Sequence, residues 1–350
     1  MERTIKEPLS TQMKRNSKEK IKKEKEYDGD FGTIISTGST LLNLAISGGR
    51  VRGGGLPGGI LVEAFGPSGS GKTVLLSEIA GGVQRQDGDI MFADPEARLN
   101  KQFAAMFGLD LKDSDYSRPD TVNELFKSIN SWEPATFKKK KINGIFADSL
   151  AALSTEMEMN KPEGDKMGMK RAKDFSEQLR KAARIIAEKN YLMVCSNQIR
   201  VNVDAGPYAA KYTTPGGVSI GFYSSLRLRF TTPSKIWDKQ KVVGKEVKRC
   251  IGVEVDVEVF KSSIWKPYHT APLYILFDYG IDDIRSNLQY IKDFTKNTTY
   301  TVGDTKLDPS LEKSIKIVEN LKLEEELKEQ VINLWEEIEA KFEQERKPKR

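Results

Sequence analysis

The sequence predicts an α/β protein with a mostly parallel, twisted sheet, a helical N-terminal arm and a small C-terminal domain of α+β or helical type. Short apolar runs alternate with longer helical periods through residues 33–283, a pattern typical of a parallel sheet covered by helices. Residues 1–32 are polar, charged and helix-prone, and the composition changes again in residues 284–350. We expect these three segments to be the domains of the chain.

Seven apolar runs are expected to form strands. They are Ile60–Phe65, Asp89–Ala93, Gly144–Asp148, Tyr191–Ser196, Ser225–Phe230, Gly252–Phe260 and Tyr274–Phe277. The amphipathic stretches Lys72–Arg85 and Met169–Lys189 are expected to form helices between the early strands. The later strands follow one another with little helix between them, which predicts an antiparallel extension of the sheet.

The two ends of the chain differ in character. The C-terminal segment contains two apolar stripes at helical spacing, Leu311, Ile315, Val318 and Leu321, then Leu327, Val331, Leu334, Ile338 and Phe342. The N-terminal segment has no such stripe. It is either a solvated extension or a basic arm that docks on a neighbouring subunit, and the sequence leaves both possibilities open.

Composition and charge exclude several classes of protein. No apolar run reaches the ~18 residues that a membrane-spanning helix needs, so no membrane association is expected. Cys195 and Cys250 are the only cysteines and His269 is the only histidine, so neither a disulfide framework nor a histidine-rich metal site is expected. The first residues show no targeting pattern, and we expect a cytoplasmic protein.

The net charge of +6 is unevenly distributed. Residues 1–25 hold nine Lys/Arg and four Glu, so most of the excess positive charge lies in the N-terminal segment. A uniformly basic coat for nucleic acid is therefore excluded. Any nucleic-acid binding would depend on local loops and on the basic arm.

The strongest motif is a glycine-rich loop between a predicted strand and a predicted helix. It matches G-x-x-x-x-G-K-[ST] in full, and the residues expected to bind a nucleotide are Gly66, Pro67, Ser68, Gly69, Ser70, Gly71, Lys72, Thr73 and Val74. Backbone N–H groups of such a loop surround the β-phosphate at a helix N-terminus. The lysine reaches the β- and γ-phosphates, and the Thr73 hydroxyl is a ligand for Mg²⁺. A chance glycine-rich turn would not have both flanking elements.

A second carboxylate is expected on a neighbouring strand. The run Gly144–Asp148 is an apolar strand that ends in an acid, so Asp148 is expected to hold Mg²⁺ through water. Strand-terminal aspartates often only cap turns, and the pairing with the glycine-rich loop favours the functional interpretation. ATP and Mg²⁺ are therefore the expected cofactors.

Further motifs resemble the RecA family of recombinases. They are Ile35–Ser39, the turn Gly55–Gly59, Asp94–Leu99, Asp148–Leu153, Asn197–Arg200, Pro215–Gly217 and Phe222–Ser225, and they occur in the family's order at nearly its spacing over residues 33–285. The resemblance implies a RecA-type P-loop core. It also implies a DNA-dependent ATPase that acts in DNA recombination and repair.

The resemblance assigns catalytic and base-binding roles. Glu96 matches the family's catalytic glutamate, which orients the attacking water, and Gln198 matches its γ-phosphate sensor. Lys261 matches a lysine that reaches the ATP of the neighbouring subunit. Phe103 falls where an aromatic ring stacks on adenine, and Asn100 falls near the base edge; both would otherwise be ordinary helix residues.

The resemblance also implies two DNA-binding loops. The first, residues 160–168, contains Met167, which matches a residue that inserts between bases, and Lys173 and Arg180 follow it. The second opens directly after Gln198, and its expected contacts are Arg200, Asn202, Val203, Tyr208, Lys211, Tyr212, Gly216 and Gly217. Aromatic and basic side chains suit stacking on bases and contact with phosphates, whereas plain surface loops and solvated helix faces are the alternatives.

The implied partners are single-stranded DNA and then double-stranded DNA, with the protein in a helical filament or a ring. A single-strand-binding protein and loader proteins are expected by analogy. The alternatives are a ring helicase on the same core and a nucleotide-regulated DNA-binding mediator or scaffold with little turnover. Three features depart from the family. Ser263 replaces a second interfacial lysine, with Lys266 nearby, the C-terminal tail is basic, and the N-terminal arm has no clear match to a specific polymerisation motif. The Lys-rich composition favours a phage-encoded protein, which would act in its host's cytoplasm.

Overall fold

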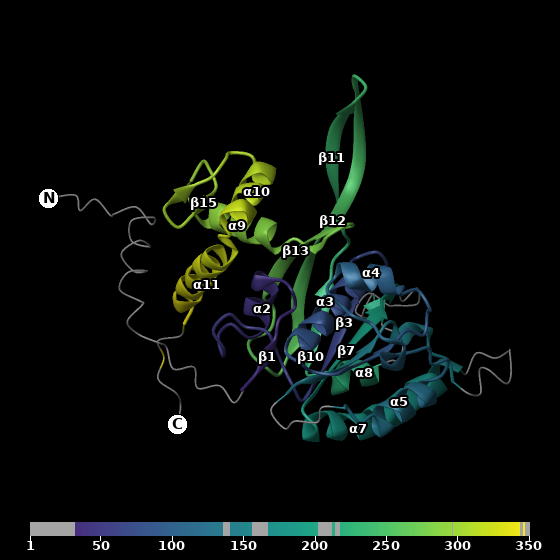
Figure 1. Cartoon of the computed structure of the whole chain (residues 1–350). Coiled ribbons are helices and arrows are strands. Elements are labelled where there is room, and N and C mark those ends of the chain that lie inside the picture. Colours follow the sequence, from purple (N-terminus) through teal and green to yellow (C-terminus); the bar gives the residue numbers. More distant parts are fainter. Residues whose placement is uncertain are drawn as a thin grey trace.

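The protein is built around a ten-stranded sheet. The computed structural model describes residues 32–135, 141–155, 167–201, 212–213, 218–295, 297–343 and 346. Neighbouring strands run in the order β14-β13-β12-β10-β3-β7-β6-β4-β5, and β11 pairs with β12 outside this path (Figure 1). The six strands from β10 to β5 are parallel, and β11 to β14 extend the sheet in antiparallel fashion. The predicted α/β class and the antiparallel extension are confirmed.

The parallel strands are β3 (Ile60–Gly66), β4 (Ile90–Ala93), β5 (Tyr116–Ser117), β6 (Asn143–Ala147), β7 (Tyr191–Gln198) and β10 (Leu226–Phe230). The antiparallel strands are β11 (Ser234–Val242), β12 (Lys245–Ser262), β13 (Thr270–Leu276) and β14 (Gly280–Ile281). Each predicted strand is present within a few residues of its expected bounds, except that β12 begins earlier. The strand β11 was not predicted.

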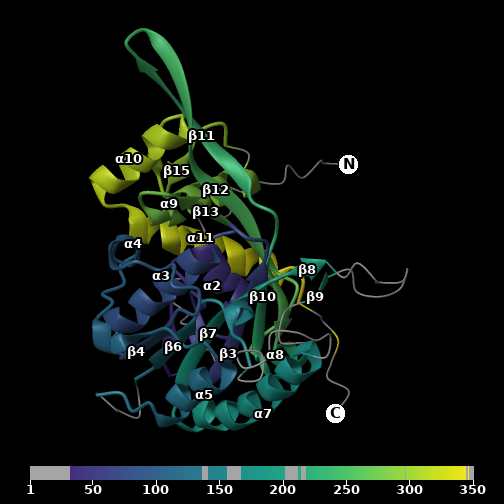
Figure 2. The same ribbon diagram turned by 90° about the vertical axis from the view of Figure 1, so that its right-hand side faces the viewer.

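Helices cover both faces of the sheet (Figure 2). One face carries α2 (Thr40–Ser47), α3 (Lys72–Arg85) and α4 (Lys101–Met106), and the other carries α5 (Val122–Ser131), α7 (Met167–Glu188) and α8 (Val218–Tyr223). Two separate apolar clusters result, because successive strand residues point to opposite faces. On β3, for example, Val62 and Ala64 belong to the first cluster and Leu61 to the second.

The C-terminal segment adds α9 (Asp283–Phe294), α10 (Leu311–Leu321), α11 (Glu324–Ala340) and the two-residue strands β15 (Thr301–Val302) and β16 (Thr305–Lys306). Leu327, Val331 and Leu334 are buried, whereas Phe342 lies beyond the helix and is 71% exposed. The buried residues join the same apolar cluster as α2 and α3. Among the described residues no helix is long and apolar enough to cross a membrane.

The remaining short elements lie at the edges. They are β1 (Ile34–Ile35) paired with β2 (Leu56–Pro57), β8 (Arg200–Val201) paired with β9 (Tyr212–Thr213), and the 3₁₀ turns Asp113–Asp115 and Leu150–Ala152. The pair β8–β9 begins two residues after β7 ends. It therefore joins the end of a central strand to residues 202–211, which lie outside the described part of the chain.

A buried ion pair connects three central strands. Glu63 on β3 is fully buried, and one of its carboxylate oxygens accepts from Arg227 Nε on β10 at 2.6 Å. The other oxygen accepts from Asn197 Nδ2 on β7 at 2.9 Å. The Arg227 guanidinium also lies 4.4 Å from the ring centroid of Phe65. Every charged atom of Glu63 therefore has a partner, as burial of a carboxylate requires.

Arg227→Met removes the cation and leaves Glu63 buried without a counter-charge. We expect the free energy of unfolding to fall by about 3–5 kcal/mol, because the remaining carboxylate stays buried without the cation that pairs with it. Urea unfolding monitored by circular dichroism measures this change. Arg229→Met is the matched control on the same strand: Arg229 pairs with Glu258 at the surface, and its loss should cost about 0–1 kcal/mol. Equal losses in the two variants would contradict the importance of the buried pair.

Candidate active site

The glycine-rich loop connects β3 to α3 as the sequence predicts. Gly71 precedes α3 in the left-handed region (φ 88°), and no side chain caps the helix. A Cβ at Gly71 would collide with Ile275, whereas a Cβ at Gly69 would meet nothing within 4 Å. The first N–H groups of α3 are therefore available on the open side of the loop, where an anion is favoured.

Lys72 lies inside this loop, and the residue is 9% exposed. Its Nζ donates to the carbonyl oxygens of Pro67 at 2.6 Å and Gly66 at 3.1 Å. Burial lowers the pKa of Lys72, and the nearby carboxylates of Asp148 and Glu96 oppose this effect. A polyanionic ligand would supply the negative charge that the burial of this ammonium calls for.

Glu96 lies between three donors from different segments. Its Oε1 accepts from Gln198 Nε2 at 3.1 Å and from Ser149 Oγ at 3.4 Å, and its Oε2 pairs with Arg98 at 2.8 Å. The structure thus brings together Glu96 and Gln198, which are 102 positions apart in sequence. Ser149 and Arg98 were not predicted as site residues, although they lie in the motifs Asp148–Leu153 and Asp94–Leu99.

Asp148 follows β6 at the carboxyl edge of the sheet. It accepts a short hydrogen bond from Ser196 Oγ on β7, a contact that the sequence analysis also missed. Thr73 is half-buried at the start of α3. Among the described residues no group of three or more His, Cys, Asp or Glu side chains forms a metal site. One hydroxyl and one carboxylate suit Mg²⁺ that arrives with a phosphate ligand, because Mg²⁺ keeps several waters.

The two residues expected to contact a base lie at α4. Asn100 is its N-cap, and its side-chain oxygen accepts from the Phe103 N–H at 2.6 Å. The Phe103 ring is partly buried and packs edge-on against Phe107, with centroids 4.5 Å apart. Both side chains therefore have structural contacts, and their contact with a base stays a prediction.

Lys261 lies on β12 near the end of α8. Its Nζ donates to the carbonyl oxygens of Gly221 and Phe222 at 2.9 and 3.0 Å. Burial lowers the pKa of Lys261, Arg227 adds to the effect and Glu63 opposes it. Ser263 Oγ donates to Ser225 O at 3.2 Å, and Lys266 Nζ lies 5.3 Å from the Trp265 ring centroid.

The residues expected to bind DNA are described only in part. Lys173 and Arg180 are exposed on α7. Met167 begins α7, and Arg200 and Tyr212 lie in the pair β8–β9, but only their backbone is described. The other predicted residues, Asn202, Val203, Tyr208, Lys211, Gly216 and Gly217, lie outside the described residues.

The loop between β3 and α3 and the carboxylates beside it place the chain in the class of P-loop nucleotide-binding proteins. The family model described as the RecA N-terminal domain matches residues 3–282. The chain therefore belongs to the RecA family.

Curated relatives agree with this assignment. Protein RecA of Delftia acidovorans is 32% identical over 248 residues, which cover 71% of this chain and 63% of the relative. Protein RecA of Anaplasma marginale (strain Florida) is 32% identical over 265 residues, which cover 75% and 68%. That of Bordetella petrii is 32% identical over 248 residues, covering 71% and 64%. The chain thus aligns with less than two thirds of the length of the Delftia and Bordetella proteins.

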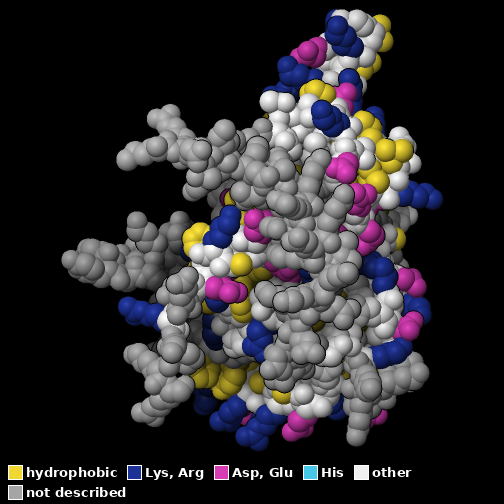
Figure 3. Space-filling model, turned by 90° about the vertical axis from the view of Figure 1, so that its left-hand side faces the viewer, with side chains coloured by type: hydrophobic (Ala, Val, Ile, Leu, Met, Phe, Trp, Pro, Cys, Tyr) yellow, Lys and Arg dark blue, Asp and Glu magenta, His cyan; other side chains and the backbone are white. Residues whose placement is uncertain are grey.

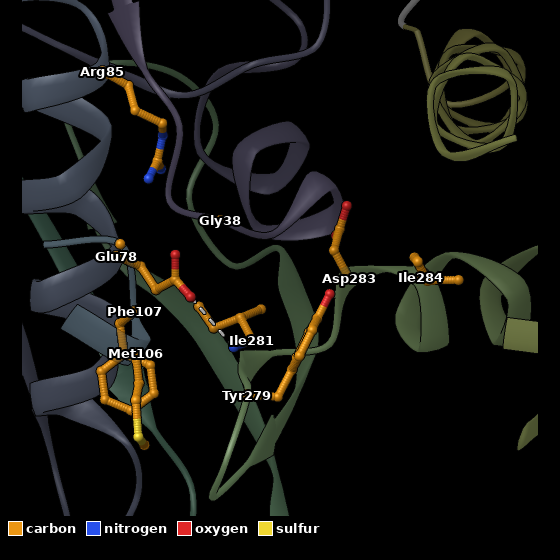
Figure 4. A pocket seen from close by; sticks show the side chains of 10 residues that line it. Gly38, Glu78, Arg85, Met106, Phe107, Tyr279, Ile281, Asp283 and Ile284 are labelled. Carbon is orange, nitrogen blue, oxygen red and sulfur yellow. Dashed lines mark hydrogen bonds between the residues drawn. The ribbon is translucent and has the colours of Figure 1, made fainter. Parts of the chain in front are cut away.

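A cavity of about 380 Å³ is lined by residues of α3 and of the segment around β14, and two of the lining residues, Glu78 and Asp283, are acidic (Figure 4). Burial raises the pKa of Glu78, and the Ile281 N–H and Arg85 oppose this effect. Burial also raises the pKa of Asp283, whose carboxylate accepts from Thr40 N and Oγ1, each at 2.7 Å. Both carboxylate oxygens of Asp283 thus accept hydrogen bonds, whereas the hydrogen bond that Ile281 N donates to Glu78 Oε1 is 3.5 Å long.

Glu78→Gln should stabilise the protein in a pH-dependent manner. The folded state binds the Glu78 proton more tightly than the unfolded chain, so the wild type loses stability as pH rises from 4.5 through the raised pKa. The amide does not ionise, so the gain should be absent near pH ~4 and should grow as pH rises through the raised pKa of Glu78. Thermal unfolding across this range measures it. Glu325→Gln is the control, because it makes the same change of charge at a side chain that is 89% exposed. An equal gain in stability in this control would show that burial of Glu78 is not the cause.

Proposed function

We propose that this protein is an ATP-dependent recombinase that forms filaments on single-stranded DNA and promotes homologous pairing and strand exchange. The observation that carries the proposal is the hydrogen bond between Gln198 and Glu96, at 3.1 Å. Gln198 is the last residue of β7, and the chain continues through β8 into the segment expected to bind DNA. Membership of the RecA family supports the same activity.

The residues present fit Mg-ATP. Lys72 and the open N-terminus of α3 would bind the β- and γ-phosphates, and Thr73 and Asp148 would hold Mg²⁺, the latter through water. Bound Mg²⁺ neutralises charge on the transferred phosphate. Phe103 on α4 and Asn100, the N-cap of that helix, would contact the base.

Glu96 would orient and deprotonate the attacking water. In the structure its carboxylate is shared by Gln198, Ser149 and Arg98, so it is held in place. A γ-phosphate oxygen is a stronger acceptor for the Gln198 amide than the Glu96 carboxylate, because it carries more charge. Transfer of that one donor to the phosphate would free Glu96 for water and move the start of β8. ATP would thereby control the grip on DNA.

The test is ATP hydrolysis with and without single-stranded DNA, with the same samples imaged by electron microscopy. We expect DNA-stimulated turnover and helical filaments. Glu96→Gln should slow hydrolysis by about 10²–10⁴-fold while ATP-dependent DNA binding remains, because the variant keeps the phosphate contacts. Glu133→Gln, at an exposed acid, is the control. Rings would indicate a helicase instead, and filaments without turnover would indicate a scaffold.

Lys261 is proposed to act on the ATP of the neighbouring protomer. Lys72→Arg keeps the positive charge but should not support hydrolysis, and Lys261→Ala should lose most of it. Mixed in equal amounts, the two variants should recover about a quarter of the wild-type rate, since about a quarter of head-to-tail interfaces would combine an intact loop with an intact Lys261. Turnover assays on co-assembled filaments measure this. A mixture that is no more active than the sum of its parts would show that Lys261 acts only within its own chain.

A further inference from the structure

The hairpin of β11 and the first half of β12 projects from the sheet (Figures 1 and 2). Among the described strands β11 pairs only with β12, and no residue from 234 to 250 is buried. Val243 and Gly244 form its tip with positive φ angles of 48° and 77°, the conformation of a tight two-residue turn. The hairpin contributes nothing to the apolar cores, so the fold itself does not explain its length.

The hairpin is strongly basic. Residues 234–249 contain six Lys/Arg and two acidic residues, a net charge of +4, while the whole chain carries +6. Several Lys/Arg side chains are visible along the projecting hairpin in Figure 3. Alternate residues Lys235, Trp237, Lys239 and Lys241 share one face of β11, and Lys248 lies directly opposite Lys239 on the same face. We call this surface the lysine face.

Two lysines lie directly opposite each other on the lysine face, and their mutual repulsion destabilises the hairpin. Like charges directly opposite each other destabilise a two-stranded ladder, and Lys239 faces Lys248. Glu246 lies 2.9 Å from Lys239, but both side chains are more than half exposed, so this pair stabilises the hairpin little. An anion bound between the two lysines would relieve this repulsion.

An aromatic ring lies among these lysines. Trp237 is 48% exposed, with Lys248 Nζ 4.5 Å and Lys235 Nζ 5.9 Å from its ring centroid. Lysines on an edge strand can simply prevent aggregation. An exposed indole has the opposite effect on solubility, so protection of the edge does not explain Trp237.

We infer that the lysine face binds single-stranded DNA at a site separate from the two predicted loops, with phosphates on the lysines and an unpaired base on Trp237. Ammonium groups around an exposed aromatic ring are the combination that binds unpaired strands without reading their sequence. In both views the hairpin lies at the opposite end of the molecule from α7, which carries Lys173 and Arg180. The inference rests on the proposed function for its choice of DNA as the polyanion.

The test compares two variants with the full-length wild type. Lys239→Ala/Lys248→Ala removes the opposed charges, and Trp237→Leu removes the aromatic ring while keeping an apolar side chain. Lys112→Ala/Lys127→Ala is the control, since it removes two exposed lysines elsewhere. Fluorescence anisotropy with a labelled oligo(dT) and with a duplex of equal length gives affinity as a function of salt.

The lysine double variant should lower the slope of log affinity against log salt by about 1.4, because each lost phosphate contact on a single strand contributes ~0.7. The ratio of wild-type to variant affinity should therefore be about 25-fold larger at ~0.1 M salt than at ~1 M salt. Trp237→Leu should weaken binding of oligo(dT) by about tenfold and binding of the duplex less, because paired bases offer no free face. The double variant should unfold at the same temperature as the wild type or a higher one, since a repulsion has been removed.

Unchanged affinity and slope in the lysine variant would overturn the inference, and so would an equal loss in the control. A loss by Trp237→Leu that is confined to the duplex would overturn the stacking on an unpaired base. ATP hydrolysis is measured on the same samples to separate the two proposals. Wild-type hydrolysis stimulated by DNA, together with unaffected binding in the hairpin variants, would refute the hairpin site and leave the proposed function intact. Absence of that stimulation, together with hairpin-dependent binding, would refute the proposed function alone.

Discussion

The buried pair of Glu63 and Arg227 is the interaction on which the arrangement of the central strands depends. A carboxylate without water must have all of its partners, and here they come from β7 and β10 on either side of β3. A shift of one residue in either pairing would point these side chains to the opposite face and leave the charge uncompensated. The pair therefore selects one register among strands whose apolar residues alone would permit others.

The active site follows from this register. With Glu63 opposite Cys195, Gly66 at the start of the phosphate loop lies beside Gln198 at the end of β7. The pairing of β6 with β7 in turn places Ala147 opposite Cys195, so Asp148 comes within reach of Ser196. Residues far apart in sequence thus meet at the carboxyl edge of the parallel strands, where ligands of open α/β sheets bind.

How much of the fold and of the active site could be predicted depends on how far apart in the sequence the interacting residues lie. The bounds of the helix Lys72–Arg85 follow from a local motif and a local periodicity, and the structure reproduces them. The donors around Glu96 depend on strand register and on loop geometry, so Ser149 and Arg98 were not identified from the sequence. The strand β11 was missed for a different reason: neither of its faces is buried, and its few apolar residues, Ile236, Trp237 and Val242, do not alternate regularly with polar ones.

The C-terminal segment is also less separate than its composition indicated. Trp265, in the loop after β12, packs against Trp335 of α11 with ring centroids 5.4 Å apart. His269 stacks on Trp265 at 4.7 Å, and its Nε2 lies 3.2 Å from Glu339. This loop directly follows Lys261, whose ammonium holds the end of α8. Because an aromatic cluster fixes the loop to α11, the helix that the sequence assigns to an appended domain constrains the position of the strand that carries Lys261. The boundary at residue 284 marks a change in composition, while the packing continues across it in a single apolar cluster.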